Sequence, residues 1–252
     1  MQKFLGWGIN QYPYVAGANL RGCVNDVIAW QNLLGAKGFS TVVLTDGMAT
    51  KANIVYQLNK LVREAKAGDV LVVAGSSHGS YVADQNGDEI DRRDEIICPY
   101  DFPRAYIRDD ELRAIFNGLP LGVICDIFLD NCYAGTGTRL MPQKHKIPVL
   151  GDRYVPFEGK PRKVADKAIV VPTLKESLFA SSGDNQTSAE VSVGGVPRGL
   201  FSFYAQKAIT SYPTHTRDQI MNYCRTKVAA VVPGQTPQLE CQAANAAKLP
   251  FS

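Results

Sequence analysis

The chain has 252 residues, of which 45% are hydrophobic and 20% are charged, so it is long enough to bury the core of one large domain. A formal net charge of +3 is too small to indicate nucleic-acid binding. The N-terminus lacks the apolar run of a signal peptide, and no apolar run approaches the roughly 18 residues that span a bilayer, so we expect a soluble, cytoplasmic protein without a membrane partner.

Strand-like and helix-like patterns alternate through the first half of the chain. The predicted elements, in order, are a strand at 3–10, a helix from Asn25 to Gly35 or Gly38, a strand at 40–47, a helix at 51–68 with Thr50 as its cap, a strand at 69–80, a helix at 109–120 and a strand at 121–130. This alternation predicts an α/β fold with a mainly parallel central sheet and helices on both faces.

The pattern lapses from Leu140 to Lys175, where the chain is basic and rich in proline. Such a stretch predicts a long functional loop or a linker. Helix-like patterns return at 198–209 and 217–231. We therefore predict one domain over 1–252, made of a first part at 1–140, a basic loop at 141–175 and a second part at 176–252.

Two of the predicted strands lead into side chains that are capable of catalysis. His78 lies near the end of the strand 69–80, and Cys132 follows the strand 121–130. In an open parallel sheet, ligands bind outside the carboxyl ends of the strands, so these side chains would face each other if the strands are neighbours. A histidine can take the proton of a thiol, whose ordinary pKa is ~8.5, and can later protonate a leaving amine. The pattern predicts a cysteine nucleophile with a histidine base.

Each residue also has a plainer interpretation. A single cysteine after a strand is usually a small buried hydrophobe, and the six cysteines show neither CxxC nor zinc spacing, which predicts free thiols. A single histidine is usually a hydrogen-bonded polar residue. His145 and His215 end no predicted strand, so His78 is the best placed of the three histidines. The pairing of His78 with Cys132 at the ends of consecutive strands favours catalysis.

Seven stretches, in one order along almost the whole chain, resemble the caspase-like cysteine proteases, and among them the type I metacaspases and bacterial metacaspase-like proteases (orthocaspases). They are LRGCVNDV (20–27), SSHGS (76–80), DEIICPYDF (94–102), IRDDELRAIF (107–116), DNCYAGTGTR (130–139), DNQTSAE (184–190) and QTPQLE (235–240). The chain differs from the family pattern in reading SSHG for SGHG and DNCYAG for D-[CS]-CHSG. The resemblance implies a caspase-like fold with a p20-like part at 1–140 and a p10-like part at 176–252.

The resemblance also implies roles for individual residues. His78 would be the base, Cys132 the nucleophile, and the backbone N–H groups of Gly79 and Cys132 an oxyanion hole. The family's acidic S1 pocket, which takes Arg or Lys, matches Cys23, Asp26, Ser76 and Asp130. Side chains alternate along a strand, so Asp130 points to the same side as Cys132 and can bind a substrate cation there. For Asp26, an acid that only stabilises the start of a helix is the alternative.

Ten acidic residues and four arginines lie between positions 84 and 111. The chemistry itself requires no cofactor, but family members that need Ca²⁺ bind it with acids in this region, and the best matches are Asp94, Asp109 and Asp110. A further family ligand falls near Arg139, a basic residue. A solvated acidic loop is the alternative to a calcium-activated site.

We predict a monomeric cysteine endopeptidase that cuts protein or peptide substrates after Arg or Lys. The alternatives are an inactive binding or scaffold module on the same fold, and a caspase-like enzyme that cuts after Asp. An enzyme of basic specificity would also meet its own basic loop, so we predict self-cleavage between Leu140 and Lys175, unless the loop packs on the body uncut. The favoured positions are Lys144, Lys146, Arg162, Lys163 and Lys167, with Arg153 and Lys175 ranked after them.

Overall fold

The computed structural model describes residues 1–252 except 84–92, 133–146, 158–173 and 184–185. The strands of this part are β1 (Gln2–Gly8), β2 (Ser40–Thr45), β3 (Val70–Ser76), β4 (Gly79–Ala83), β5 (Arg93–Ile97), β6 (Ile107–Arg108), β7 (Ile124–Asp130), β8 (Val149–Asp152), β9 (Ser177–Ala180), β10 (Ala189–Val193), β11 (Val196–Gly199) and β12 (Gln238–Glu240). The helices are α1 (Cys23–Gly35), α2 (Lys51–Glu64), α3 (Asp109–Asn117), α4 (Leu200–Ser211), α5 (Arg217–Ala229) and α6 (Ala243–Ala246), with a 3₁₀ turn at Asp46–Met48. Within the described ranges, no helix combines the length and the apolar character that crossing a bilayer requires.

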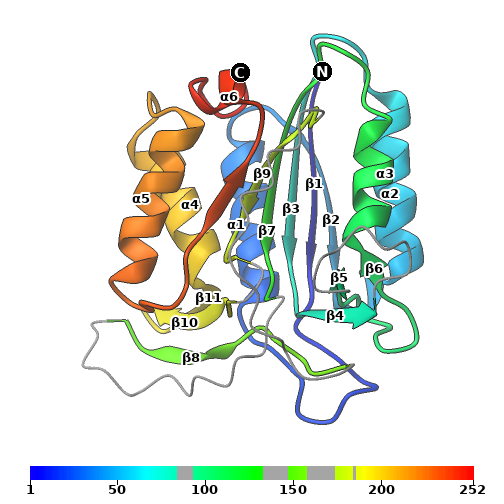
Figure 1. The fold of residues 1–252 in the computed structure, drawn as a ribbon, viewed down its shortest axis with the longest axis vertical. Coiled ribbons are helices and arrows are strands. Elements are labelled where there is room, and N and C mark those ends of the chain that lie inside the picture. The colour runs from blue at the N-terminus through cyan, green and yellow to red at the C-terminus, as the bar shows by residue number, and fades with distance from the viewer. Residues whose placement is uncertain (84–92, 133–146, 158–173, 184–185) are drawn as a thin grey trace.

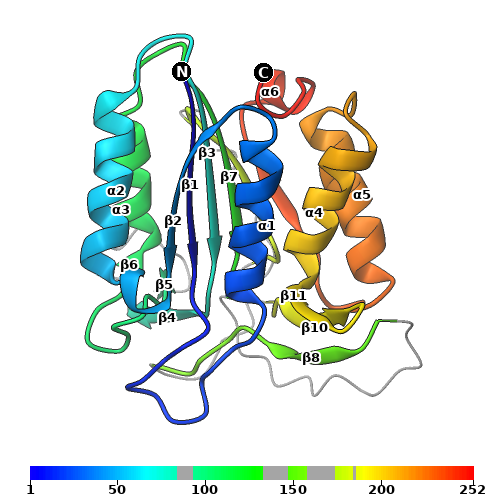
Figure 2. The ribbon, with the colours of Figure 1, turned by 180° about the vertical axis from the view of Figure 1, so that it is seen from behind.

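The centre of the molecule is a six-stranded sheet in the order β12-β9-β7-β3-β1-β2. All neighbouring pairs are parallel except β12 with β9, which is antiparallel. Helices α1, α4 and α5 cover one face, and α2 and α3 cover the other (Figures 1 and 2). The predicted α/β fold with a mainly parallel sheet is confirmed.

Alternating side chains on the central strands pack into two separate hydrophobic cores, one on each face of the sheet. Val72 and Phe128 belong to the cluster with α1, α4 and α5, whereas Leu71 and Ile127 belong to the cluster with α2 and α3. This follows from the period of two along a strand. Strands buried on both faces are apolar throughout, which is why these segments read as continuous hydrophobic runs.

The local sequence predicts the capping residue of α2 correctly but not that of α1. Thr50 caps α2 as predicted, its side chain accepting from the backbone N–H of Asn53 at 3.3 Å. The prediction that Asn25 caps α1 is wrong, because α1 begins at Cys23 and Asn25 lies inside it. The side-chain oxygen of Asn10 instead accepts from the backbone N–H of Cys23 at 2.9 Å. A residue from the loop after β1 thus serves as the cap.

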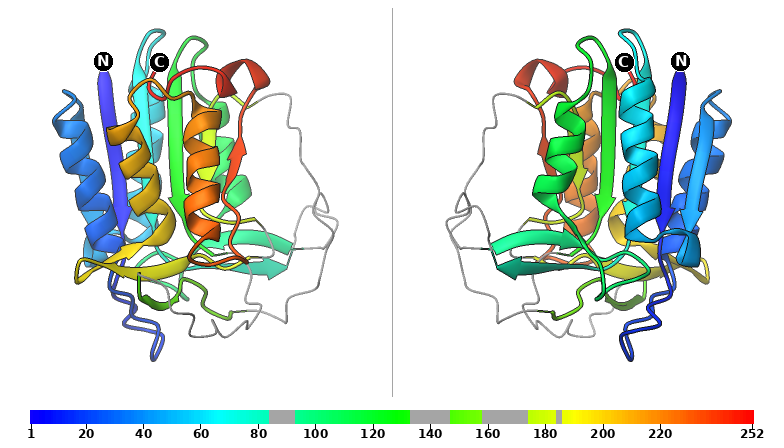
Figure 3. Two further views of the ribbon diagram at one scale, coloured as in Figure 1. Left: turned by 90° about the vertical axis from the view of Figure 1, so that its left-hand side faces the viewer. Right: turned by 90° about the vertical axis from the view of Figure 1, so that its right-hand side faces the viewer.

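Two small antiparallel sheets lie at the carboxyl ends of the parallel strands (Figures 1 and 3). One has the order β4-β5-β6 and the other β11-β10-β8. They correct two predictions. The expected strand at 69–80 is two elements, β3 and β4, with the turn at Ser77–His78 between them. The expected loop at 141–175 contains a strand, β8, which pairs with β10.

Candidate active site

The ends of β3 and β7 bring the two predicted catalytic residues to the same edge of the sheet. These strands are parallel neighbours with Ser76 opposite Asp130, so His78 and Cys132 each follow two residues beyond a paired position. The side chain of Asn131 ties the two ends together, because its amide donates to the hydroxyl of Ser77 at 2.6 Å and to the carbonyl of Ser77 at 3.2 Å. The predicted neighbourhood of the two strands is confirmed.

His78 is held by contacts on both its ring and its backbone. Nε2 lies 2.7 Å from the carbonyl oxygen of Ala18, and a carbonyl only accepts, so Nε2 carries the proton. Nδ1 is buried without a hydrogen-bond partner among the described residues and is left as the basic nitrogen. The backbone N–H of His78 donates to the hydroxyl of Tyr12 at 2.8 Å. Burial lowers the pKa of His78, so the ring is neutral near pH 7 and can accept a proton.

Cys132 is fully buried beside Ser188. Its Sγ donates to the carbonyl oxygen of Ser188 at 3.1 Å, and the backbone N–H of Ser188 donates to the sulfur. Burial raises the pKa of the Cys132 thiol, so the thiol is protonated in this arrangement. Both residues are buried at the ends of their strands, with exposed fractions of 4% for His78 and 0% for Cys132. The backbone of Arg153 lies against both residues.

A glycine is required at position 79 because the backbone of Cys132 approaches it closely. A Cβ at Gly79 would stand 2.2 Å from the carbonyl oxygen of Cys132, a distance no real side chain tolerates. The N–H of Gly79 donates to the carbonyl oxygen of Arg153 at 3.0 Å. Gly79 therefore offers a backbone donor to a peptide carbonyl lying beside the cysteine, which is the role of an oxyanion-hole donor.

The predicted pocket residues surround a guanidinium group that belongs to the chain itself. Arg153 is fully buried, and its Nη2 lies 2.7 Å from Oδ2 of Asp26 and 3.8 Å from Oε1 of Glu190. Its Nη1 lies 3.2 Å from Oδ1 of Asp130 and 2.7 Å from the hydroxyl of Ser76. Burial acts to lower the pKa of Arg153. The surrounding negative groups, Asp130 first among them, act more strongly in the opposite direction, so the pKa of Arg153 lies well above its ordinary value.

Each pocket carboxylate is oriented by neighbours from the second half of the chain. Asp26 also accepts from Nε of Arg198 at 2.8 Å. Asp130 accepts from the hydroxyl of Ser188 at 2.6 Å and from the backbone N–H of Ser202, in the first turn of α4, at 2.9 Å. Donors at a helix N-terminus favour an anion. The pocket is therefore a preorganised set of buried negative charges.

Two further residues complete the pocket wall. Cys23 is buried beside Arg153, and burial raises the pKa of its thiol to about 12 although Arg153 acts to lower it, so Cys23 stays an uncharged thiol. A Cβ at Gly199 would stand 2.2 Å from Oδ2 of Asp130 and 2.6 Å from Nη1 of Arg153. A side chain at Gly199 would therefore fill the space that the guanidinium occupies.

The structure adds residues to the candidate site that the sequence interpretation missed. Glu190 and Arg198 were not assigned roles, although Glu190 lies in one of the matching stretches, DNQTSAE. The carbonyl of Ala18 and the backbone of Ser188 carry no side-chain signal at all. Glu190 accepts from the backbone N–H of Gly22 at 2.6 Å, which joins the pocket to the start of α1.

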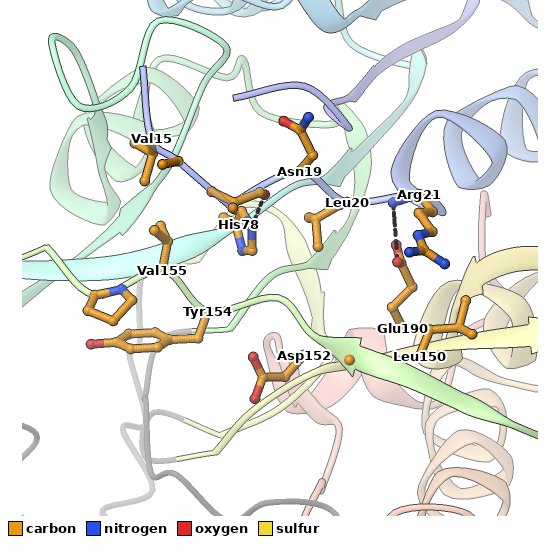
Figure 4. A pocket seen from close by; sticks show the side chains of 15 residues that line it. Val15, Asn19, Leu20, Arg21, His78, Leu150, Asp152, Tyr154, Val155 and Glu190 are labelled. Carbon is orange, nitrogen blue, oxygen red and sulfur yellow. Dashed lines mark hydrogen bonds between the residues drawn. The ribbon is translucent and has the colours of Figure 1, made fainter. Parts of the chain in front are cut away.

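An open pocket of about 440 Å³ borders His78. It is lined on one side by residues 15–21 and on the other by residues 150–152 and 154–156. Figure 4 shows His78 between Leu20 on one side and Tyr154 and Val155 on the other. The open pocket beside His78 is thus bounded by the same segment that carries Arg153.

The predicted calcium ligands lie near one another but are largely paired. β5 and β6 are neighbours, and Asp94 forms an ion pair with Arg108, whereas Asp109 and Asp110 lie 3.6 Å and 3.8 Å from the guanidinium of Arg113. Among the described residues, no group of three or more His, Cys, Asp or Glu side chains could hold a metal ion. A calcium site at Asp94, Asp109 and Asp110 stays a prediction.

The five favoured self-cleavage positions, Lys144, Lys146, Arg162, Lys163 and Lys167, lie outside the described residues. Of the two positions ranked after them, Lys175 donates to the carbonyl oxygen of Asn117 at 2.7 Å. Arg153 occupies the pocket.

Comparison with known proteins yields one family and one fold. Residues 2–141 match the model of the metacaspase, peptidase C14 domain. The chain is 30% identical to metacaspase-1B of Aspergillus oryzae, over 95% of this chain and 67% of that protein, and 28% identical to metacaspase-1 of Eremothecium gossypii, over 95% of this chain and 64% of that protein. A crystal structure of a protein from Geobacter sulfurreducens superposes with a TM-score of 0.74 at 22% identity, covering 100% of this chain and 98% of that one. Caspase-1 from Spodoptera frugiperda gives 0.63 at 12% identity, covering 94% and 85%.

Proposed function

Because the chain belongs to the metacaspase family, whose peptidase C14 members are cysteine-type endopeptidases, we propose that it cleaves protein or peptide chains on the carboxyl side of arginine and lysine. The chain spans 64% of the length of metacaspase-1 of Eremothecium gossypii, so this proposal concerns the peptidase domain. One observation carries the specificity. The carboxylates of Asp26, Asp130 and Glu190 converge on a single buried guanidinium.

The pocket chemistry favours arginine over lysine. Both terminal nitrogens of Arg153 are used, Nη2 by Asp26 and Nη1 by Asp130 and Ser76. A lysine offers one ammonium in place of this planar fork and would satisfy only part of the set. An aspartate at the same place would meet buried like charges, which disfavours the alternative of a caspase-like Asp specificity.

The described residues supply the steps of peptide hydrolysis. The thiol of Cys132 adds to the substrate carbonyl carbon while His78 takes the thiol proton. The N–H of Gly79 binds the carbonyl oxygen as it gains charge, and His78 then protonates the leaving amine. The backbone N–H of Cys132 remains a predicted second donor. Asn131 and the carbonyl of Ala18 position these groups.

The dyad is tested with fluorogenic peptides that carry Arg, Lys or Asp at the cleaved position. We expect hydrolysis of the Arg and Lys peptides, and loss of hydrolysis in Cys132→Ala and in His78→Ala with circular dichroism and melting profiles of a folded protein. Near-wild-type turnover by either variant would reject the dyad. A folded wild type that binds peptides without any turnover would instead favour the scaffold module.

Calcium activation remains a prediction. Asp109 has one buried carboxylate oxygen without a hydrogen-bond partner in the described part of the chain, which a cation could use. Arg108 and Arg113 already neutralise its surroundings. A calcium titration followed by melting temperature, compared between wild type and Asp109→Asn, decides the question, because a calcium ligand predicts a shift in the wild type alone.

A further inference from the structure

Residues 148–155, hereafter the blocking segment, lie in the active site in the manner of a bound substrate. Strand β8 of this segment pairs antiparallel with β10, as an extended peptide does when it adds to a sheet edge. The backbone N–H of Arg153 then donates to the carbonyl oxygen of Ser188 at 3.0 Å. The carbonyl of Arg153 accepts from Gly79, while the side chain fills the acidic pocket.

The contacts of Arg153 single out one peptide bond. Its carbonyl oxygen is bound by the proposed oxyanion donor, and its backbone lies close enough to both His78 and Cys132 to influence the pKa of each. The bond that follows this carbonyl joins Arg153 to Tyr154. Every element that the proposed reaction requires, namely an arginine in the pocket, a bound carbonyl and the two catalytic groups, therefore meets at the Arg153–Tyr154 bond.

The chain is anchored on the far side of this bond as well. Val155 is 5% exposed and packs into the hydrophobic core shared with α2 and α3. Its N–H donates to the carbonyl oxygen of Gly79 at 3.3 Å. The ring of Phe157 lies 4.9 Å from that of Phe102, centroid to centroid. Tyr154 stacks on Tyr81 at 6.3 Å. A chain so held on both sides is a stable occupant of the groove.

We propose that the blocking segment is an internal substrate that closes the active site, that Arg153–Tyr154 is the bond that the same molecule cuts first, and that the site opens to other substrates only when Arg153 leaves the pocket. This proposal rests on the proposed function for its cutting step. The occupied pocket is a property of the structure that can be measured without any proteolysis.

The cutting step balances as ordinary peptide hydrolysis. The Sγ of Cys132 forms a bond to the carbonyl carbon of Arg153, and the bond from that carbon to the nitrogen of Tyr154 breaks. The thiol proton passes through His78 to the new amine of Tyr154. Water then attacks the thioester, its proton passes through His78 to the departing sulfur, and Arg153 ends as a carboxylate. No oxidant, reductant or other reactant is consumed.

Cutting alone does not empty the pocket. After the break, β8 still pairs with β10, so the guanidinium of Arg153 remains tethered beside Asp26 and Asp130. A tethered group competes at an effective concentration on the order of millimolar. An added substrate must therefore displace Arg153, and removal of this side chain should lower the apparent KM of arginine peptides at least tenfold and abolish any lag in the reaction.

The first experiment measures occupancy without catalysis. In a Cys132→Ala background, melting temperatures are recorded with increasing agmatine, a small guanidinium compound, for Arg153 intact, for Arg153→Ala, and for Arg225→Ala as a matched control. Arg225 lies on α5 and donates to the carbonyl oxygen of Pro237 at 2.9 Å. We expect agmatine to raise the melting temperature of Arg153→Ala alone. Equal shifts in all three proteins, or no shift in any, would reject the proposal that Arg153 occupies the acidic pocket.

The second experiment identifies the bond. Mass spectrometry follows wild type, Cys132→Ala and Arg153→Ala over long incubation at several dilutions. We expect fragments ending at Arg153 and beginning at Tyr154 in the wild type only, at a rate independent of dilution. A first cut elsewhere, or an uncut wild type that hydrolyses arginine peptides as well as Arg153→Ala does, would overturn the proposal.

The two experiments also separate this proposal from the proposed function. If neither wild type nor Arg153→Ala hydrolyses any arginine or lysine peptide, the proposed function fails, and the agmatine shift still reports whether Arg153 occupies the pocket. If both proteins hydrolyse these peptides with the same apparent KM and without a lag, the function stands and the closure of the site by Arg153 is rejected.

Discussion

The substitution Asp26→Asn tests the specificity pocket most directly, provided that it is made in an Arg153→Ala background in which added substrate can enter. Asp26 uses both carboxylate oxygens, because Oδ2 lies 2.7 Å from Nη2 of Arg153 and Oδ1 lies 2.8 Å from Nε of Arg198. A guanidinium group only donates hydrogen bonds. An asparagine of the same shape must therefore turn its own NH₂ donor toward one of the two arginines.

The size of the effect follows from this lost acceptor. A hydrogen bond to a charged group contributes roughly 1.5–3 kcal/mol, and 1.36 kcal/mol corresponds to a tenfold change in rate. We therefore expect kcat/KM for an arginine peptide to fall roughly 10- to 150-fold when a substrate guanidinium takes the place of Arg153. A citrulline peptide has the shape of arginine without its charge, so its slow hydrolysis should change much less.

A control separates specificity from stability. Asp126 is equally buried and lies 2.6 Å from Nε of Arg217, but its other contact is the backbone N–H of Phe251 near the C-terminus. Asp126→Asn should lower the melting temperature without changing the ratio of arginine to citrulline hydrolysis. If Asp26→Asn keeps kcat/KM for arginine within roughly threefold, less than 1 kcal/mol, the assignment of Asp26 to the pocket is refuted.

Three further predictions each concern one residue. Gly79→Ala should abolish peptide hydrolysis, because its Cβ would stand 2.2 Å from the carbonyl oxygen of Cys132; measurable turnover by a folded variant would contradict this. Tyr12→Phe should lower the free energy of unfolding by about 1–3 kcal/mol in urea titrations, since the backbone N–H of His78 and the carbonyl of Cys98 lose a buried partner; an unchanged midpoint would show that water replaces the hydroxyl. Burial lowers the pKa of His78 below its ordinary value of 6.5, so the folded state binds less proton than the unfolded state, and stability should fall as the pH drops from 6.5 toward the folded pKa. Between pH 7.5 and 5.5, the melting temperature of His78→Gln should therefore fall less than that of the wild type. Identical pH profiles of the two proteins would contradict the lowered pKa of His78.

Much of the central architecture was determined by the sequence itself. The apolar runs of β3 and β7 and the amphipathic pattern of α2, with Ile54 and Leu58 buried, depend on periodicities that a chain carries locally. Strands that alternate with helices form a parallel sheet, and parallel strands place their carboxyl ends at one edge. The location of His78 and Cys132 at the same edge of the sheet could therefore be predicted from the sequence. The pocket carboxylates Asp26 and Asp130 were likewise predicted, through the resemblance.

Other features were decided only by contacts between distant segments. Asn10 caps α1 across a loop, and Glu190 and Arg198 reach the pocket from more than 160 positions beyond Asp26. The short strands of the two small sheets carry too few residues to show a period. Backbone groups such as the carbonyl of Ala18 have no sequence signature, because every residue has one.

The role of Arg153 shows most clearly where sequence reasoning ends. Composition marked residues 141–175 as a basic loop in which five other positions ranked ahead of it. Nothing local distinguishes this arginine from its neighbours, since a charge becomes special only when several opposite charges surround it and water is removed. Asp26, Asp130 and Glu190 come together from α1, β7 and β10, and only the folded chain places all three around the one guanidinium.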